Sequence, residues 1–305
     1  MGLEFRGGKW KEVAKSSDQP VQVQVHERGD GLEVVCSLTL QGEAFTRRMW
    51  FRNDEPAIRC RVAGKAAEGH SVIARFATNL LAHTLVMDTP GGVVARPLQR
   101  FYAPTFWPFQ HFVHMQDEGD GQGLAVLQTM PGAVALQSDG TLELVAMRNA
   151  TQETAFGFIH LPANPASGHE REAYTFDYAL LLTAAGDWHN NGMARKAQDL
   201  INNNPWDDPA RAALQKRADE SVTTDDPGVR VTALKLASRG KGAIIRLYSP
   251  SLPETPVTVT ANDFTVTSAF LCDARERDLE PLPVQDNSVQ VTMPGTIATI
   301  RLLQS

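Results

Sequence analysis

Residues 86–148, VMDTPGGVVARPLQRFYAPTFWPFQHFVHMQDEGDGQGLAVLQTMPGAVALQSDGTLELVAMR, decide the fold class of this 305-residue chain. Turn signals rich in Gly, Pro and Asp recur at residues 90–92, 117–123 and 138–140, because these residues tolerate the backbone angles of a reversal. Between the turns lie short apolar runs of strand length, such as GLAVLQ at residues 123–128. The stretch therefore predicts the middle of a large β-sheet.

The segments on either side of this stretch continue the same pattern. Residues 20–62 alternate with period two and turn at Arg28-Gly29-Asp30-Gly31, which is typical of an antiparallel meander. Residues 71–87 and 141–184 add further strands. The chain up to residue 204 is therefore predicted to be one large β-sandwich domain.

One helix and a second domain follow. Residues 189–204 place Met193, Ala197 and Leu200 on one helical face, and Pro205 ends the helix. Residues 205–228 are polar and contain two Asp-Asp-Pro sequences, which predicts a surface linker. Residues 229–305 carry six short apolar runs at regular spacing, which predicts a small C-terminal β-sandwich.

Several motifs follow one another in a characteristic order. They are Pro90-Gly91-Gly92 with Arg96-Pro97, Asp117 with Gly123–Leu127, Leu144–Arg148, Tyr174–Leu180 before Gly186-Asp187-Trp188, Thr232–Lys235, Ile245–Tyr248, Asp273–Arg277 with Pro281-Leu282, and Ile297–Leu302. Their order and spacing resemble the C-terminal β region of glycoside hydrolase family 38, the α-mannosidases. The resemblance implies an all-β fold: a large galactose mutarotase-like supersandwich, one connecting helix and a small C-terminal β-sandwich.

The same resemblance implies where the chemistry lies. Family 38 enzymes carry a zinc site of two Asp and two His, with an Asp nucleophile, in an N-terminal α/β domain and follow a retaining mechanism. None of those motifs occurs in this chain, so we expect no catalytic residue, metal ligand or cofactor here. Zinc, a mannose-containing substrate and an N-terminal catalytic domain as partner are implied for the intact enzyme, with that domain upstream of residue 1.

Two residues are candidate substrate contacts. In the family, the loop after the strand that ends at Arg148 approaches the sugar cleft, where a guanidinium can hydrogen-bond hydroxyl groups in a fixed fork. An ion pair at a strand edge is the structural alternative for Arg148. Trp107 belongs to the aromatic run and can stack on a sugar face if the chain is a carbohydrate-binding module. The family's Lys-Tyr-Gly-Tyr sequence is replaced here by residues 129–133, TMPGA, so a tyrosine pair of the cleft is missing.

Other polar groups favour structural roles. His111 and His114 are three residues apart, which places them on opposite faces of a strand and argues against a shared metal. The acidic turn around Asp117 misses the ligand spacing of a calcium loop. Glu170, Glu172 and Asp177 are acid–base candidates, for which a charged loop and strand edge is the structural alternative. The three cysteines, Cys36, Cys60 and Cys272, are interpreted as small buried residues.

Two other functions compete with a non-catalytic role in a mannosidase. An aldose epimerase on a mutarotase-like fold needs a His acid and a Glu base; His83, His114 or His160 are candidates for the acid. A stand-alone carbohydrate-binding module is the other alternative.

The overall charge and the sequence ends limit the partners. The net charge of -6 argues against a nucleic acid or an anionic membrane. No apolar run is long enough to span a bilayer, and residues 1–13 lack the apolar segment of a signal peptide, so we expect a cytoplasmic protein. A homo-oligomer is compatible with the sequence.

Overall fold

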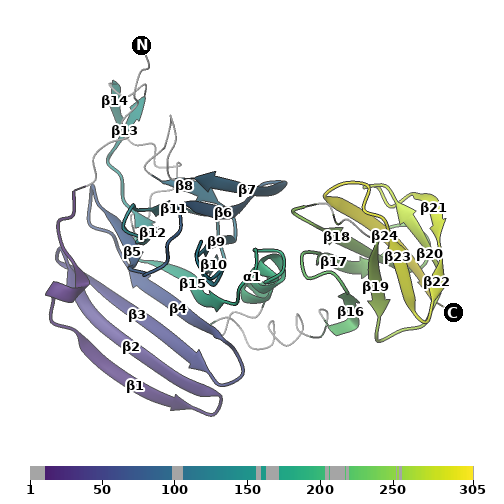
Figure 1. Ribbon diagram of the computed structural model, residues 1–305, viewed down its shortest axis with the longest axis horizontal. Helices are drawn as coiled ribbons and strands as arrows, with labels where there is room; N and C mark the ends of the chain where they lie inside the picture. The colour runs from purple at the N-terminus through teal and green to yellow at the C-terminus, as the bar shows by residue number, and fades with distance from the viewer. Residues whose placement is uncertain are drawn as a thin grey trace. The chain divides into compact units, whose positions relative to one another are not determined.

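The computed structural model describes residues 11–97, 106–155, 159–162, 172–202, 206, 217, 220–251, 253 and 256–304. These residues are mainly antiparallel strands, which confirms the predicted all-β class (Figure 1). The chain divides into two compact units, Met1–Met87 with Ala95–Ala185, and Asp88–Val94 with Gly186–Ser305. No helix in the described part of the chain has the length and apolar character of a membrane span.

The first unit contains most of a nine-stranded sheet of order β1-β2-β3-β4-β15-β10-β9-β6-β7, without residues 88–94 of β6 and β7, and a four-stranded sheet of order β5-β12-β11-β8. The short 3-10 helix η1 (Ser16–Asp18) precedes them. The strands are β1 (Gln22–Arg28), β2 (Gly31–Leu40), β3 (Glu43–Arg52), β4 (Ala57–Gly64), β5 (Ser71–Phe76), β6 (Thr84–Thr89), β7 (Gly92–Pro97), β8 (Trp107–Phe109), β9 (Phe112–Gln116), β10 (Gly123–Gln128), β11 (Gly132–Leu136), β12 (Leu142–Arg148) and β15 (Tyr174–Thr183), with a separate ribbon of β13 (Gln152–Ala155) and β14 (Ile159–Pro162).

The core of the first unit lies between the inner faces of these two sheets. Tyr178 on β15 contacts Phe76 on β5, with ring centroids 5.8 Å apart. On β12, Leu142 and Leu144 are fully buried. The GLAVLQ run, β10, is buried at every position between β9 and β15, which explains why its sequence is apolar rather than alternating.

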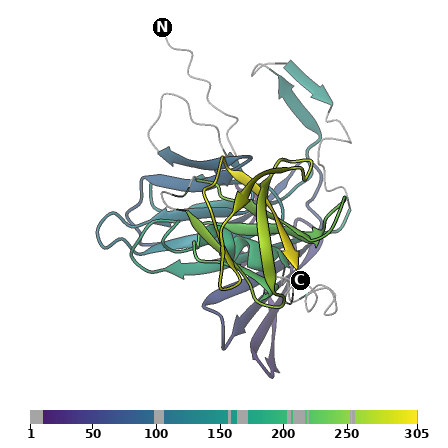
Figure 2. The ribbon, with the colours of Figure 1, turned by 90° about the vertical axis from the view of Figure 1, so that its right-hand side faces the viewer.

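The outer end of the large sheet differs from its centre. Strands β1 to β3, purple in Figures 1 and 2, pair in continuous register through the predicted turn at Gly29 and Asp30. All seven residues of β1 are exposed, including Val23 and Val25. The period-two alternation correctly places these valines on one face, but in the structure neither of them is covered.

The second unit contains the helix and the C-terminal sandwich. Helix α1 (Met193–Asn202) is shorter than the predicted 189–204, because Asp187 holds residues 190 and 191 in a turn before it; residues 203–205 lie outside the described part. The sandwich has sheets of order β16-β19-β23-β22 and β17-β18-β24-β20-β21. Its strands are β16 (Val222–Thr224), β17 (Arg230–Leu236), β18 (Ala243–Tyr248), β19 (Val257–Ala261), β20 (Val266–Cys272), β21 (Asp278–Leu282), β22 (Val284–Gln285), β23 (Ser288–Val291) and β24 (Ile297–Gln304).

Six of these strands coincide with the six predicted runs, whereas β16, β21 and β22 were not predicted. Strand β16 lies in the stretch predicted as a linker; it pairs with β19 and buries Val222 in the sandwich core. A three-residue strand gives too short a pattern to be recognised in the sequence. The rest of the predicted linker lies mostly outside the described residues.

Candidate functional site

Trp107, the first predicted sugar contact, begins strand β8. It pairs with Val134 on β11, which pairs in turn with Leu144 on β12. Directly opposite residues of antiparallel strands share a face, and Val134 and Leu144 are fully buried, so Trp107 belongs to the inner face of the small sheet. The Arg96 guanidinium lies 4.3 Å from the centre of the Trp107 ring, in a cation–π contact. One face of the indole is therefore already occupied.

Arg148, the second predicted contact, is the exposed last residue of β12. A bulge between Val145 and Met147 shifts the register against β5, so that Met147 is buried and Arg148, opposite Ser71, points outward. Arg148 and Trp107 thus lie on opposite faces of one sheet, about 15 Å apart from the spacing of residues and strands. The structure does not bring the two together in one site.

The carboxylate candidates have neighbours that neutralise or cap them. Asp177 is 9% exposed and forms a bidentate ion pair with Arg61, with both N–O distances 2.6 Å. Glu172 is exposed, and Glu170 lies outside the described residues. Asp117 accepts hydrogen bonds from the backbone N–H groups of Leu81, Gly119 and Asp120, and these bonds lower the pKa of its carboxyl group. These two aspartates therefore have partners that hold them in place in the fold.

The histidines are dispersed. His114 is buried, and its Nε2 lies 3.0 Å from Thr183 Oγ1, whereas His111 precedes β9. His83 Nδ1 lies 3.0 Å from Glu118 Oε1 at the surface, where both side chains are about half exposed. The side chain of His160 lies outside the described residues. Within the described part of the chain, no group of three or more His, Cys, Asp or Glu side chains is placed to hold a metal ion.

A small buried cluster joins Tyr178, Cys60 and Arg47 on the inner face of the large sheet. Burial raises the pKa of the Cys60 thiol and of the Tyr178 hydroxyl, so both stay neutral at physiological pH. The described cysteines are free thiols: Cys60 and Cys272 are buried, as predicted for all three, whereas Cys36 is partly exposed. Burial also raises the pKa of Cys272, to about 12, which keeps its thiol neutral.

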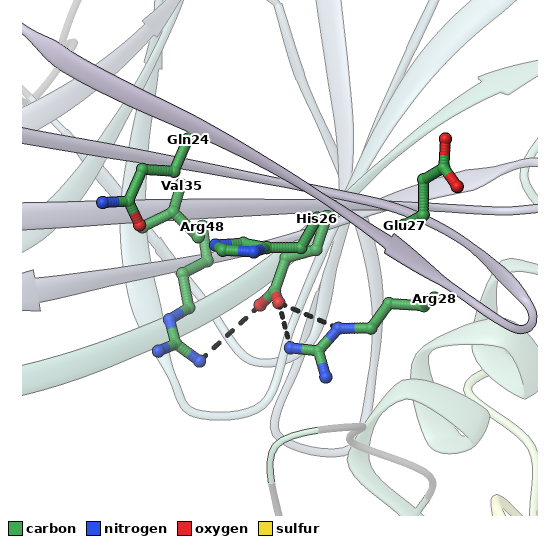
Figure 3. A pocket seen from close by; sticks show the side chains of 7 residues that line it. Gln24, His26, Glu27, Arg28, Val35 and Arg48 are labelled. Carbon is green, nitrogen blue, oxygen red and sulfur yellow. Dashed lines mark hydrogen bonds and ion pairs between the residues drawn. The ribbon is translucent and has the colours of Figure 1, made fainter.

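A polar hollow of about 310 Å³, which the sequence did not predict, lies on β1, β2 and β3 (Figure 3). Glu33 is 2% exposed at its base and accepts hydrogen bonds from the Arg28 guanidinium, while Arg48 Nη1 lies 3.6 Å from its other oxygen. Gln24 and His26 also line the hollow. In the sequence, the period-two spacing of Gln24, His26 and Arg28 could have indicated that these polar side chains share one face of a strand. Because the carboxylate is held by cations, the hollow suits the binding of polar groups rather than proton transfer.

The C-terminal sandwich is similar in sequence to a known protein family. Residues 228–299 match the model of the glycosyl hydrolases family 38 C-terminal beta sandwich domain. The resemblance predicted from the sequence motifs is therefore confirmed, and the chain carries a glycoside hydrolase-related domain. No curated protein matches the chain.

Two solved structures from Enterococcus faecalis share the fold of nearly the whole chain. An α-mannosidase from strain V583 aligns over 94% of this chain with a TM-score of 0.67 and 12% identity. A protein in glycosyl hydrolase family 38 aligns over 93% with a TM-score of 0.65 and 14% identity. The chain spans only 35% and 36% of their lengths, about a third of each.

Proposed function

We propose that this chain is the non-catalytic C-terminal β portion of an α-mannosidase-like glycoside hydrolase. The observation that carries the proposal is the family 38 match at residues 228–299, in a chain whose fold accounts for about a third of an α-mannosidase. In this proposal, retaining hydrolysis of α-mannosides occurs on a separate N-terminal catalytic domain that binds zinc. The chain supports that domain and forms part of its sugar cleft.

The chemistry of the described residues supports a non-catalytic role. Retaining hydrolysis needs two carboxyl groups about 5 Å apart, one of them ready to attack as a nucleophile. Asp177 and Glu33 are instead held by arginines, and the described residues do not fit a zinc ion. Within the cleft of the intact enzyme, we propose Arg148 as a hydrogen-bond donor to sugar hydroxyls. Trp107 lies on the opposite face of the same sheet and stacks on Arg96, so its role as a sugar contact stays a prediction separate from that cleft.

No described feature favours the two alternative functions. An aldose epimerase needs a His acid and a Glu base around an enclosed sugar, whereas His83 and Glu118 meet on the open surface. A stand-alone binding module needs aromatic rings free to stack, whereas Trp107 already stacks on Arg96.

Enzyme assays and metal analysis of the purified 305-residue chain test the proposal. We expect no hydrolysis of an aryl α-mannoside above the blank, no aldose mutarotation and less than stoichiometric zinc by mass spectrometry. Hydrolysis by the chain alone, or one zinc per chain, would show that the reaction centre lies within these residues. Mutarotation at an enzymatic rate would establish the epimerase alternative instead.

A further inference from the structure

Strand β1 is an open edge of the nine-stranded sheet. It pairs with β2 over all seven residues, and in the described part of the chain no strand pairs with its other side. Val23 and Val25 are 58% and 61% exposed, although they alternate with polar residues as in a half-buried strand. An edge of this kind is a template for pairing with another strand.

The other edge strands of the four larger sheets are less exposed or carry features that disfavour such pairing. Strand β5 is partly buried at five of its six positions, and β7 ends at Pro97. Strand β17 has a bulge after Val231 and carries Lys235, β21 contains Pro281 beside a register shift, and β8 contains Pro108. The edges β16 and β22 are only three and two residues long. Strand β1 has no Pro, Lys or bulge. Although its last two residues, Glu27 and Arg28, are charged, β1 is exposed at all seven positions, which makes it an edge suited to association.

The hydrogen-bonding phase of β1 shows which backbone groups are available. The two-residue turn Gly29-Asp30 closes on the pair Arg28 and Gly31, which is a hydrogen-bonded pair in such a hairpin. Pairing alternates along the ladder, so the N–H and C=O groups of Val23, Val25 and Glu27 point away from β2. Within the described part of the chain, these three residues present six groups along the edge that no strand pairs with.

We propose that β1 pairs antiparallel with β1 of a second copy of this chain, about a two-fold axis at Val25. In this register, Val25 faces Val25 of the second copy, and Val23 faces Glu27. Every outward group then finds a partner, giving six inter-chain hydrogen bonds. The valines of both copies form one continuous stripe, because directly opposite residues share a face.

The charges of β1 select this orientation. Antiparallel pairing places Arg28 opposite Gln22 and Glu27 opposite Val23, so that no like charges face each other. A parallel in-register pair would place Arg28 beside Arg28 and Glu27 beside Glu27, which is destabilising. Seven residues per copy are fewer than the 20–30 of a standard interface, so we expect a weak dimer that dissociates in the micromolar range, on the order of 1–100 μM.

Sedimentation velocity of the full chain over a concentration series tests the dimer. We expect the mass to rise from 33.4 kDa toward twice that value as the concentration increases. Val25→Pro removes an outward N–H that β2 does not use, so it should weaken dimerisation at least about tenfold while β1 stays in the sheet. Leu236→Lys, a charge placed at an exposed apolar residue of the second unit, is the matched control and should change nothing.

A charge exchange gives a second test that does not depend on proline. Val25→Lys and Val25→Glu should each weaken self-association, because two like charges then meet at the two-fold axis. An equimolar mixture of the two variants should dimerise again. The proposal is wrong if the native chain stays monomeric up to several hundred micromolar, if Val25→Pro dimerises like the native chain, or if the mixture stays monomeric.

Discussion

The C-terminal sandwich and the outer end of the large sheet use similar strands with opposite results. In the sandwich, Ile245, Leu247 and Ile300 point between two sheets and are fully buried. At the outer end of the large sheet, Val23 and Val25 alternate in the same manner and stay exposed. Alternation therefore determines which side chains share a face, whereas burial depends on a second layer that the strand's own sequence does not encode.

The largest expected effect tests this difference directly. Ile245→Ala in the sandwich should lower the free energy of unfolding by about 2–5 kcal/mol, because it removes buried methyl groups and leaves a cavity. Val25→Ala at the open edge, the matched control, should change it by less than about 0.5 kcal/mol. Urea unfolding monitored by circular dichroism measures both. A cost at Val25 equal to that at Ile245 would mean that the edge is covered in solution.

A second test compares ion pairs within the large sheet. Asp177→Asn disrupts a bidentate pair with a largely buried Arg61 and should cost about 3 kcal/mol, because it leaves the guanidinium without its counter-charge. Asp54→Asn removes an exposed carboxylate that pairs with Arg52 and should leave the unfolding midpoint unchanged. Equal effects of the two substitutions would contradict the distinction between the centre of the sheet and its rim.

The sequence predicted those turns and strands whose formation depends on short stretches of residues. The turn at Gly29 and Asp30, the buried strand 123–128 and the six main strands of the C-terminal sandwich all have short-range signals of turn chemistry and apolar runs. The order of the family 38 motifs extended the prediction from these local elements to the fold of nearly the whole chain.

What the sequence did not predict depends on pairing between distant residues. Arg61 and Asp177 are 116 positions apart, and only the register between β4 and β15 brings them together. The bulge that turns Arg148 outward, and the stacking of Trp107 on Arg96, likewise follow from neighbouring strands. The candidate site residues were therefore chosen by residue type, and their separation in space became visible only in the fold.

The smallest expected effect concerns the rim of the C-terminal sandwich, where Glu276 has a positive φ of 64°. Its carboxylate pairs with Lys235 and accepts hydrogen bonds from the backbone N–H and hydroxyl of Ser238. The Lys235 hydrogen bond, followed by that from the Ser238 N–H, lowers the pKa of Glu276 from 4.5 to about 2. A lowered pKa means that the stabilisation is fully present above the unfolded-state pKa near 4.5 and is lost as the pH falls toward 2.

Glu276→Gln should therefore lower the melting temperature at pH 7, and the gap to the native chain should close between pH 4.5 and 2. Asp286→Asn is the matched control, because Asp286 is an exposed turn residue whose φ is also positive, and it should change the melting temperature at pH 7 only slightly. Thermal unfolding followed at several pH values measures both. If the difference in melting temperature between Glu276→Gln and the native chain persists unchanged down to pH 2, neutral hydrogen bonds of the side chain, rather than its charge, stabilise this rim. The ion pair with Lys235 then contributes nothing to the stability that distinguishes the closed sandwich from the open edge of β1.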